Sequence, residues 1–364
     1  MCRRGRREKH GVHDMKPRVY QFTETRRVDF KNGAVSHTRI VGSISATTTF
    51  LLKPILPFRL DLTVWVLRRR PSNLVDRWDG QTYRRVLVLD SQPVEAAVTQ
   101  TGLSDSPRLR VTLTGRLITS NLKTAAVKSL ERLLGLRISL SDFYGRAAND
   151  AKLNPLVERF RGMKPPRFPT VFETLANAIA CQQMSLSLGI LLLSRMTEKF
   201  GLATDGTPDS AHAFPRPEDL AGLKPMDFRR LGFSRAKGES LIALARACAS
   251  GQVNLEAVDG LSNEAVVERL LELKGVGRWS AEYVLLRGLG RLNVYPGDDV
   301  GARNNLHRWL KLRKPLDYDG VRRITSRWQP HAGLVYFHML LDRLDAAGHL
   351  ISKNQTTGGS NDLG

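Results

Sequence analysis

Residues 273–281 read Leu-Lys-Gly-Val-Gly-Arg-Trp-Ser-Ala, with an apolar helical repeat before and after them. The spacing of Gly275 and Gly277 predicts a tight hairpin between two short helices, because glycine lacks a Cβ and lets another backbone approach closely. The helix that opens at Gly277–Arg278 exposes unpaired amide groups at the positive end of its dipole. Such a hairpin favours an anion, and a phosphate fits this chemistry.

The hairpin therefore predicts a site for a DNA backbone. Lys274 and Arg278 add positive charge on either side of the glycines, and hairpins of this type often hold the phosphate through a bridging monovalent cation. No other cofactor is expected. The candidate DNA contacts here are Lys274, Gly275, Val276, Gly277 and Arg278. A plain turn between two helices remains the alternative, because most Gly-x-Gly pairs are only turns.

About one helix further along, Pro296-Gly297-Asp298-Asp299 ends an extended segment and begins a helix. Aspartate is among the best residues at a helix N-cap, so one of the two carboxylates is expected to cap and the other to face a cleft. A fixed carboxylate would stabilise the positive sugar that forms when an N-glycosidic bond breaks, and would orient a water molecule. Without the hairpin, capping alone would explain the motif.

Together the two motifs resemble those of the helix-hairpin-helix (HhH-GPD) DNA glycosylases, within them the 3-methyladenine DNA glycosylase II, or AlkA-like, branch. The resemblance covers about 50–348 and is strongest in 172–185, 271–287 and 295–303. It implies an α-helical catalytic core and an N-terminal antiparallel domain. It also places the catalytic carboxylate on Asp299, with Asp298 as a cap or support.

The resemblance gives roles to two further segments. The turn at Gln182-Gln183 matches the segment that enters the minor groove, with Gln183 as the wedge that replaces the extruded base and Gln182 as the alternative. Packing of a polar turn against its neighbours would explain this turn equally well. Trp279 and Tyr283, one helical turn apart, would line the base pocket, where aromatic faces stack on electron-poor alkylated bases. Core packing is the alternative for both.

Trp279 also distinguishes two kinds of glycosylase. Family members that cut the DNA strand carry a lysine here, which forms a Schiff base with the sugar; an indole cannot do so. The resemblance thus implies a monofunctional enzyme. One position departs from the pattern, since Leu340 stands where close relatives carry an aromatic residue that stacks on the damaged base. Four aromatic residues lie near it in the sequence and could substitute: Trp328, His331, Tyr336 and Phe337.

The composition of the 364 residues agrees with a polyanionic partner. Lys and Arg number 56 against 35 Asp and Glu, a formal net charge of +21, and neutralising phosphates releases counterions. Cys2, Cys181 and Cys248 cannot form a disulfide framework or a four-cysteine cluster, which indicates a reducing compartment. No apolar run would span a bilayer and no secretory signal is apparent. We expect a monomer without membrane contact, cytoplasmic and nucleoid-associated, or nuclear in a eukaryote.

The chain is expected to have an α+β fold in four parts. These are a basic, disordered arm (1–45), an N-terminal α+β domain (46–150), the helical core (151–348) and a flexible tail (349–364). In the N-terminal domain, alternation of apolar residues predicts strands at Phe58–Leu67, Thr82–Leu89 and Arg108–Thr114. A helix is predicted at Asn121–Leu134, with Asn121 as its cap and Gly135 at its end.

The helical core should contain a break near Cys181–Gln183 within the long apolar segment Phe172–Lys199. A turn is predicted at 231–234, and a helix at Glu264–Leu273 capped by Ser262 or Asn263.

The sequence thus predicts a monofunctional DNA glycosylase that flips a damaged, alkylated purine from duplex DNA and hydrolyses its N-glycosidic bond with the help of Asp299. An alkylated purine is already cationic and leaves easily, so no metal and little acid catalysis are needed. Two alternatives stay open. One is a DNA-binding hairpin protein without hydrolytic activity, and the other is a glycosylase for oxidised or deaminated bases.

Overall fold

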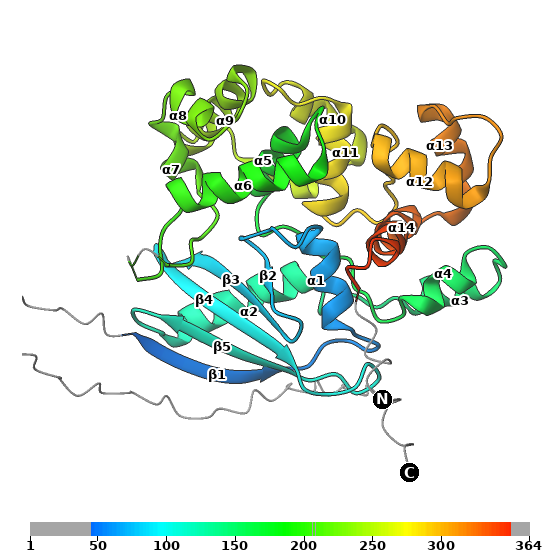
Figure 1. Cartoon of the computed structure of the whole chain (residues 1–364), viewed down its shortest axis with the longest axis horizontal. Helices are drawn as coiled ribbons and strands as arrows, with labels where there is room; N and C mark the ends of the chain where they lie inside the picture. The colour runs from blue at the N-terminus through cyan, green and yellow to red at the C-terminus, as the bar shows by residue number, and fades with distance from the viewer. Residues whose placement is uncertain (1–44, 206, 208, 351–364) are drawn as a thin grey trace, which may run out of the picture.

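The computed structural model describes residues 45–205, 207 and 209–350 (Figure 1). An antiparallel sheet combines with a larger set of helices, which confirms the α+β fold class. The predicted arm at 1–45 and most of the tail at 349–364 lie outside the described residues. Within the described part of the chain, no helix is both long and apolar enough to cross a membrane.

The five strands pair antiparallel in the order β1-β5-β4-β3-β2. Their bounds are β1 (Ala46–Leu52), β2 (Arg77–Trp78), β3 (Thr82–Leu89), β4 (Gln92–Gln100) and β5 (Leu109–Gly115). The register aligns Phe50 with Val111, Val111 with Val98, and Val98 with Tyr83. All four are buried, so this face of the sheet carries the core. The strands predicted at Thr82–Leu89 and Arg108–Thr114 are confirmed.

The strand predicted at Phe58–Leu67 is wrong, because this segment forms the helix α1 (Leu60–Arg68). One face of α1, with Leu60, Val64 and Leu67, packs in the sheet core. Its other face, including Trp65 and Val66, packs against the C-terminal helices. A helix buried on both sides carries apolar residues all round. In this segment they also fall at alternate positions, which is the pattern that predicted a strand.

Helix α2 (Ser120–Leu134) covers the core face of the sheet. Its N-cap is Thr119, whose hydroxyl accepts the Leu122 amide, so the prediction of Asn121 as the cap is wrong. Gly135 ends the helix in the left-handed conformation, as predicted. The helices α3 (Ser141–Ala148) and α4 (Asn154–Arg159) follow.

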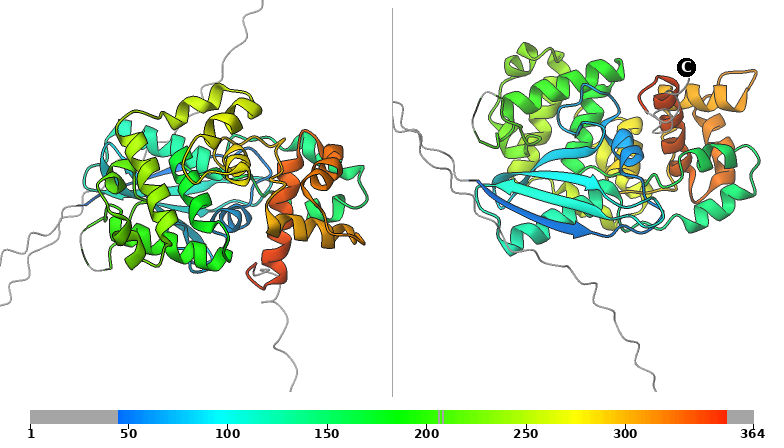
Figure 2. Two further views of the ribbon diagram at one scale, coloured as in Figure 1. Left: turned by 90° about the horizontal axis from the view of Figure 1, so that it is seen from above. Right: turned by 60° about the horizontal axis from the view of Figure 1, so that its bottom comes forward.

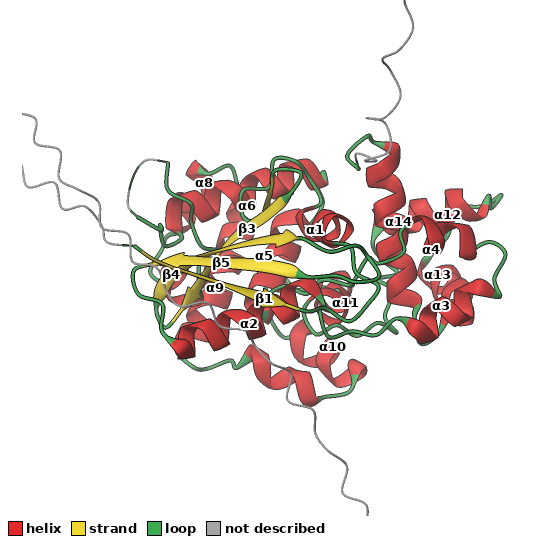
Figure 3. Cartoon of the chain, turned by 90° about the horizontal axis from the view of Figure 1, so that it is seen from below, coloured by secondary structure: helices red, strands yellow, loops and turns green. Residues whose placement is uncertain are grey.

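The remaining helices form two groups; in Figures 2 and 3 the second group lies at one end of the molecule, and the first extends from the middle towards the other end. The first group comprises α5 (Val171–Cys181), α6 (Leu186–Phe200), α7 (Pro217–Ala221), α8 (Pro225–Arg230), α9 (Arg235–Ala249), η1 (Leu255–Gly260), α10 (Asn263–Leu271) and α11 (Arg278–Arg287). The second comprises α12 (Val300–Leu310), α13 (Tyr318–Thr325), η2 (Ser326–Trp328) and α14 (Ala332–Ala346), packed with α3 and α4. The break after Cys181, the turn before α9 and the Ser262 cap of α10 are confirmed.

A buried ion network fastens the sheet to the first helical group. Arg85 on β3 donates to Asp76 at 2.7 Å and to both oxygens of Glu173 on α5 at 2.5 and 2.6 Å. Tyr83 also donates to Asp76, at 2.8 Å. The side chains of Arg85, Asp76 and Glu173 are 1%, 2% and 6% exposed. A buried cation thus holds a strand and a helix 88 residues apart in sequence.

His338 on α14 predicts a loss of stability in acid. Its Nδ1–H donates to the Leu334 carbonyl at 2.8 Å, and burial lowers the pKa of His338 to about 4 from 6.5. The unfolded chain therefore takes up a proton at a higher pH than the folded one, and stability falls as the pH drops from 6.5 towards 4. The loss should reach roughly 3 kcal/mol.

Urea unfolding at pH 7 and pH 4.5 would measure this loss. His338→Leu should reduce the difference between the unfolding free energies at the two pH values. His331→Leu, at a residue that pairs with Asp142, should show a larger difference than His338→Leu does. Equal acid sensitivity in wild type and His338→Leu would contradict this source of the effect.

Candidate active site

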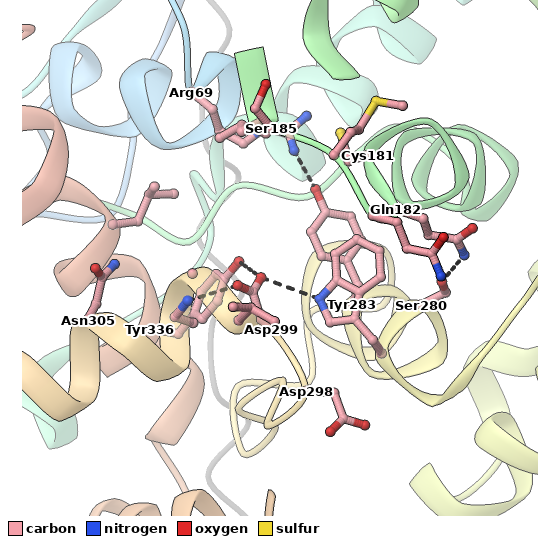
Figure 4. Close-up of a pocket in the computed structure, with 18 of the residues that line it drawn as sticks. Arg69, Cys181, Gln182, Ser185, Ser280, Tyr283, Asp298, Asp299, Asn305 and Tyr336 are labelled. Atoms are coloured by element: carbon pink, nitrogen blue, oxygen red, sulfur yellow. Dashed lines mark hydrogen bonds between the residues drawn. The ribbon is translucent and has the colours of Figure 1, made fainter. Parts of the chain in front are cut away.

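A pocket of about 810 Å³ opens where α1, α11, α12, α14 and the turn between α5 and α6 meet (Figure 4). Its lining includes Asp299 and three aromatic side chains, Trp279, Tyr283 and Tyr336. These residues come from two helices, α11 and α14, and from the N-cap of α12, so only folding brings them together. A pocket of this size suits a small ligand, and its aromatic side chains suit a planar one.

Asp299 both caps a helix and faces this pocket. Its Oδ1 accepts the Ala302 amide at 2.8 Å and so caps α12. Its Oδ2 accepts the Tyr336 hydroxyl at 3.2 Å and the Trp279 indole N–H at 3.4 Å. The carboxylate is therefore fixed by bonds from three different elements, with one oxygen directed to the pocket (Figure 4).

Asp298 does not cap the helix, so that alternative from the sequence is wrong. Its carboxylate instead pairs with Arg278 at 2.7 Å, and this hydrogen bond raises the pKa of Arg278. The Arg278 guanidinium lies 3.8 Å from the centre of the Tyr318 ring. Asp298 thus also lines the pocket, but its carboxylate is paired with Arg278 beside the hairpin.

Glu282 on α11 positions the segment that carries both aspartates. Its Oε2 accepts the Gly297 amide at 3.0 Å, and its Oε1 accepts the Tyr318 hydroxyl at 2.6 Å. Burial raises the pKa of Glu282. Sequence reasoning missed this residue. The only signal was a carboxylate within an otherwise apolar run of α11.

The hairpin forms as predicted between α10 and α11, and the surroundings of its two glycines differ. Gly275 has φ +81°, and a Cβ there would lie 2.3 Å from the Ser240 hydroxyl. Gly277 is the N-cap of α11, with extended backbone, and a Cβ added there would meet no atom within 4 Å. The protein itself therefore requires only the first glycine, and the second faces open space.

The side chains around these glycines already have partners. Lys274 pairs with Glu239 at 3.1 Å, and the Val276 side chain is buried in the helical core. Only the backbone of Val276 is thus free to meet another molecule. Both groups that carry charge, Lys274 and Arg278, remain more than half exposed.

The turn between α5 and α6 presents its two glutamines differently. Gln182 donates to the Gly275 carbonyl and to the Ser280 hydroxyl, both at 2.9 Å, so it is tied to the hairpin. Gln183 is exposed and has φ +51°, a conformation uncommon for a residue with a side chain. Lys237 donates to the carbonyls of Ala180 and Gln182 and so helps to fix the backbone of the turn.

Arg69, at the C-terminal end of α1, forms part of the inner wall of the pocket. It donates to the Tyr283 hydroxyl at 2.9 Å and to the Asn177 side-chain oxygen at 2.7 Å. Sequence reasoning missed it, because nothing distinguishes it from its arginine neighbours in the run 68–70.

Leu340 lines the pocket at the position where an aromatic residue was expected. Of the four suggested substitutes, Tyr336 also lines it. Phe337 is fully buried beside Arg287, and Trp328 packs on Trp309. The aromatic surface of this pocket therefore comes from Tyr336 and from α11.

Comparison with known proteins assigns these features to a family. Residues 176–331 match the family described as HhH-GPD superfamily base excision DNA repair protein. A solved structure of a 3-methyladenine DNA-glycosylase from Archaeoglobus fulgidus is similar at a TM-score of 0.70 and 26% identity, covering 81% of this chain and 99% of that one.

Two curated relatives are similar in sequence. DNA-3-methyladenine glycosylase 1 of Schizosaccharomyces pombe is 34% identical over 172 residues, or 46% of this chain and 72% of that protein. A putative DNA-3-methyladenine glycosylase of Bacillus subtilis is 31% identical over 162 residues, or 44% of this chain. The match spans 55% of the length of this second relative.

Proposed function

This chain belongs to the HhH-GPD superfamily of base excision DNA repair proteins, and we propose that it is a monofunctional DNA glycosylase that removes alkylated purines from duplex DNA. The observation that carries the proposal is the pocket-facing Oδ2 of Asp299 beside two aromatic rings of α11. The names of the relatives, all 3-methyladenine glycosylases, support the same class of substrate.

In this mechanism the damaged nucleotide leaves the duplex and its base enters the pocket. Trp279 and Tyr283 contact the base, while Asp299 faces the anomeric carbon of the sugar. The bond from that carbon to the base nitrogen breaks, and its electron pair stays on the base. The ionised carboxylate stabilises the cationic sugar until water adds, and the water proton passes to Asp299 or to solvent. The products are a free base and an abasic site.

We expect no lyase activity, because of the residues that line the pocket. A strand-cutting glycosylase needs a nucleophilic amine to form a Schiff base with the sugar. Trp279 has none, and no lysine is among the lining residues in the described part of the chain. Its indole N–H instead donates to Asp299.

The DNA backbone would contact the hairpin at the open side of Gly277, directly or through a monovalent cation, with Lys274 and Arg278 alongside. Gln183 would fill the gap in the duplex, because it is exposed at the tip of its turn while Gln182 is tied to the hairpin. A monomer suffices for this arrangement, since both motifs and the pocket belong to one chain.

Gly277→Ala should weaken binding to duplex DNA about tenfold without lowering the melting temperature. The added methyl group meets no protein atom within 4 Å, so only a bound molecule can collide with it. The slope of affinity against salt should stay unchanged, since no charge is removed. Gly222→Ala, also in open space, is the matched control and should bind normally. Equal affinities of the two variants would contradict contact at Gly277.

The test of the proposed function is mass analysis of the bases released from alkylated, oxidised and deaminated DNA. Alkylated purines should dominate, and borohydride should trap no covalent adduct. Binding without an abasic product would favour a DNA-binding module instead. A trapped adduct, or release of oxidised bases alone, would overturn the proposal.

A further inference from the structure

The three aromatic side chains of the pocket differ in where their polar hydrogens point. The N–H of Trp279 and the O–H of Tyr336 both donate to Asp299. The oxygen of Tyr283 instead accepts a hydrogen bond from Arg69 at 2.9 Å. Within the described residues, the Tyr283 hydroxyl hydrogen has no acceptor. A buried donor left without a partner is costly, and a ligand that brings an acceptor would satisfy it.

Arg69 is a buried cation that makes no direct ion pair, within 4 Å, with a carboxylate of the described residues. It is 5% exposed, its two bonded partners are the neutral groups of Tyr283 and Asn177, and its Nε–H is unpaired. A cation that donates to a hydroxyl oxygen withdraws electrons from it and makes the hydroxyl a stronger donor. Arg69 thus strengthens the free donor of Tyr283.

A second buried cation acts on the same ring. The guanidinium carbon of Arg287 lies 5.7 Å from the centre of the Tyr283 ring, and this side chain is 1% exposed. A ring face is attractive to a cation because of its negative quadrupole. Because Arg69 and Arg287 both withdraw electron density from Tyr283, its ring attracts a stacked cationic base less strongly than the ring of an isolated tyrosine would.

We propose that Arg69 makes Tyr283 a hydrogen-bond donor to the departing base, so that this pair determines how well the pocket removes neutral purines relative to cationic ones. The inference rests on the proposed function and names a specificity-determining pair for it. Tyr283 would contact the base itself, and Arg69 is a positioning residue that acts through Tyr283.

The chemistry of the leaving group explains the difference. When the bond between a neutral purine and the sugar breaks, the electron pair makes the base an anion, and water then supplies the proton that neutralises it. A hydrogen bond donated by the protein to a ring nitrogen or exocyclic oxygen of the base stabilises that growing negative charge. A cationic alkylated purine leaves as a neutral molecule and gains little from the same donor. Asp299 cannot supply this stabilisation, because it is negative.

The experiment compares single-turnover release of hypoxanthine, a neutral base, with that of 7-methylguanine, a cationic base, from otherwise identical duplexes. Tyr283→Phe should slow release of hypoxanthine by about tenfold or more and change release of 7-methylguanine by less than about threefold. Tyr336→Phe is the control: its hydroxyl contacts Asp299, so both rates should fall together.

Arg69→Met should lower the ratio of the hypoxanthine rate to the 7-methylguanine rate, as Tyr283→Phe does. Arg69→Lys, which keeps a hydrogen-bond donor, should bring this ratio part of the way back to the wild-type value. Melting temperatures show whether the Arg69 variants fold; if they do not, Tyr283→Phe alone decides. Parallel changes for the two bases, or no change, would overturn the inference. Wild type that releases 7-methylguanine but no hypoxanthine would overturn it while leaving the proposed function intact, whereas release of neither base would overturn both.

Discussion

Asp299→Asn should reduce base excision at least about 10²-fold while the affinity for duplex DNA stays near normal. Asparagine caps helices as well as aspartate does, so the bond to the Ala302 amide and the start of α12 should persist. What disappears is the negative charge that faces the pocket. Single-turnover release of 7-methylguanine measures the chemistry, and fluorescence anisotropy with labelled duplex measures binding.

Asp298→Asn is the matched control for this variant. Asp298 precedes Asp299 in the chain, but its carboxylate pairs with the half-exposed Arg278. Pairs of this kind contribute little, so excision should remain within a few-fold of wild type. Near-normal turnover of Asp299→Asn would refute the catalytic role of Asp299. An equal loss in both variants would show that the segment, and not the single charge, is what matters.

Arg85→Met should lower the free energy of unfolding by about 3–5 kcal/mol, because it breaks a buried ion pair. The substitution leaves Asp76 and Glu173 buried without the guanidinium that forms an ion pair with both. Domains are stable by only about 5–15 kcal/mol in total, so a large share would be lost. Urea unfolding followed by circular dichroism measures the change through the midpoint and the slope.

Arg84→Met provides the comparison, because Arg84 is the neighbouring residue on β3. Its side chain is 39% exposed and pairs with the exposed Asp79. Its removal should cost less than about 1 kcal/mol. If the two variants unfold at the same urea concentration, the buried network does not hold the sheet to α5.

The sequence predicted the hairpin, the helix break after Cys181 and the N-cap before α12 because each has a local cause. Glycine at positive φ, a polar turn between apolar runs and aspartate at a helix start are decided within a few residues. The position of Gln183 at an exposed tip also follows from its turn. The resemblance to glycosylases then supplied the expected roles, which remain proposals.

The sequence could not predict features that depend on distant contacts. The segment 60–68 alternates like a strand, and only its burial between two cores makes it a helix. The bonds from Arg69 to Tyr283 and from Tyr336 to Asp299 join residues 214 and 37 positions apart. Of the two adjacent aspartates, Asp299 caps α12 while Asp298 pairs with Arg278, 20 positions away in the sequence.

The position of Arg69 has a consequence for how this protein can be divided or recombined. The hairpin, both aspartates and the glutamine turn all lie after residue 170, so the helical half looks like a portable unit. Yet Arg69 and Arg70 reach the pocket from the N-terminal half, and Arg85 anchors the helix that leads to the turn. If the helical half were fused to a different N-terminal domain, it would keep Asp299, but we expect its preference among damaged bases to change.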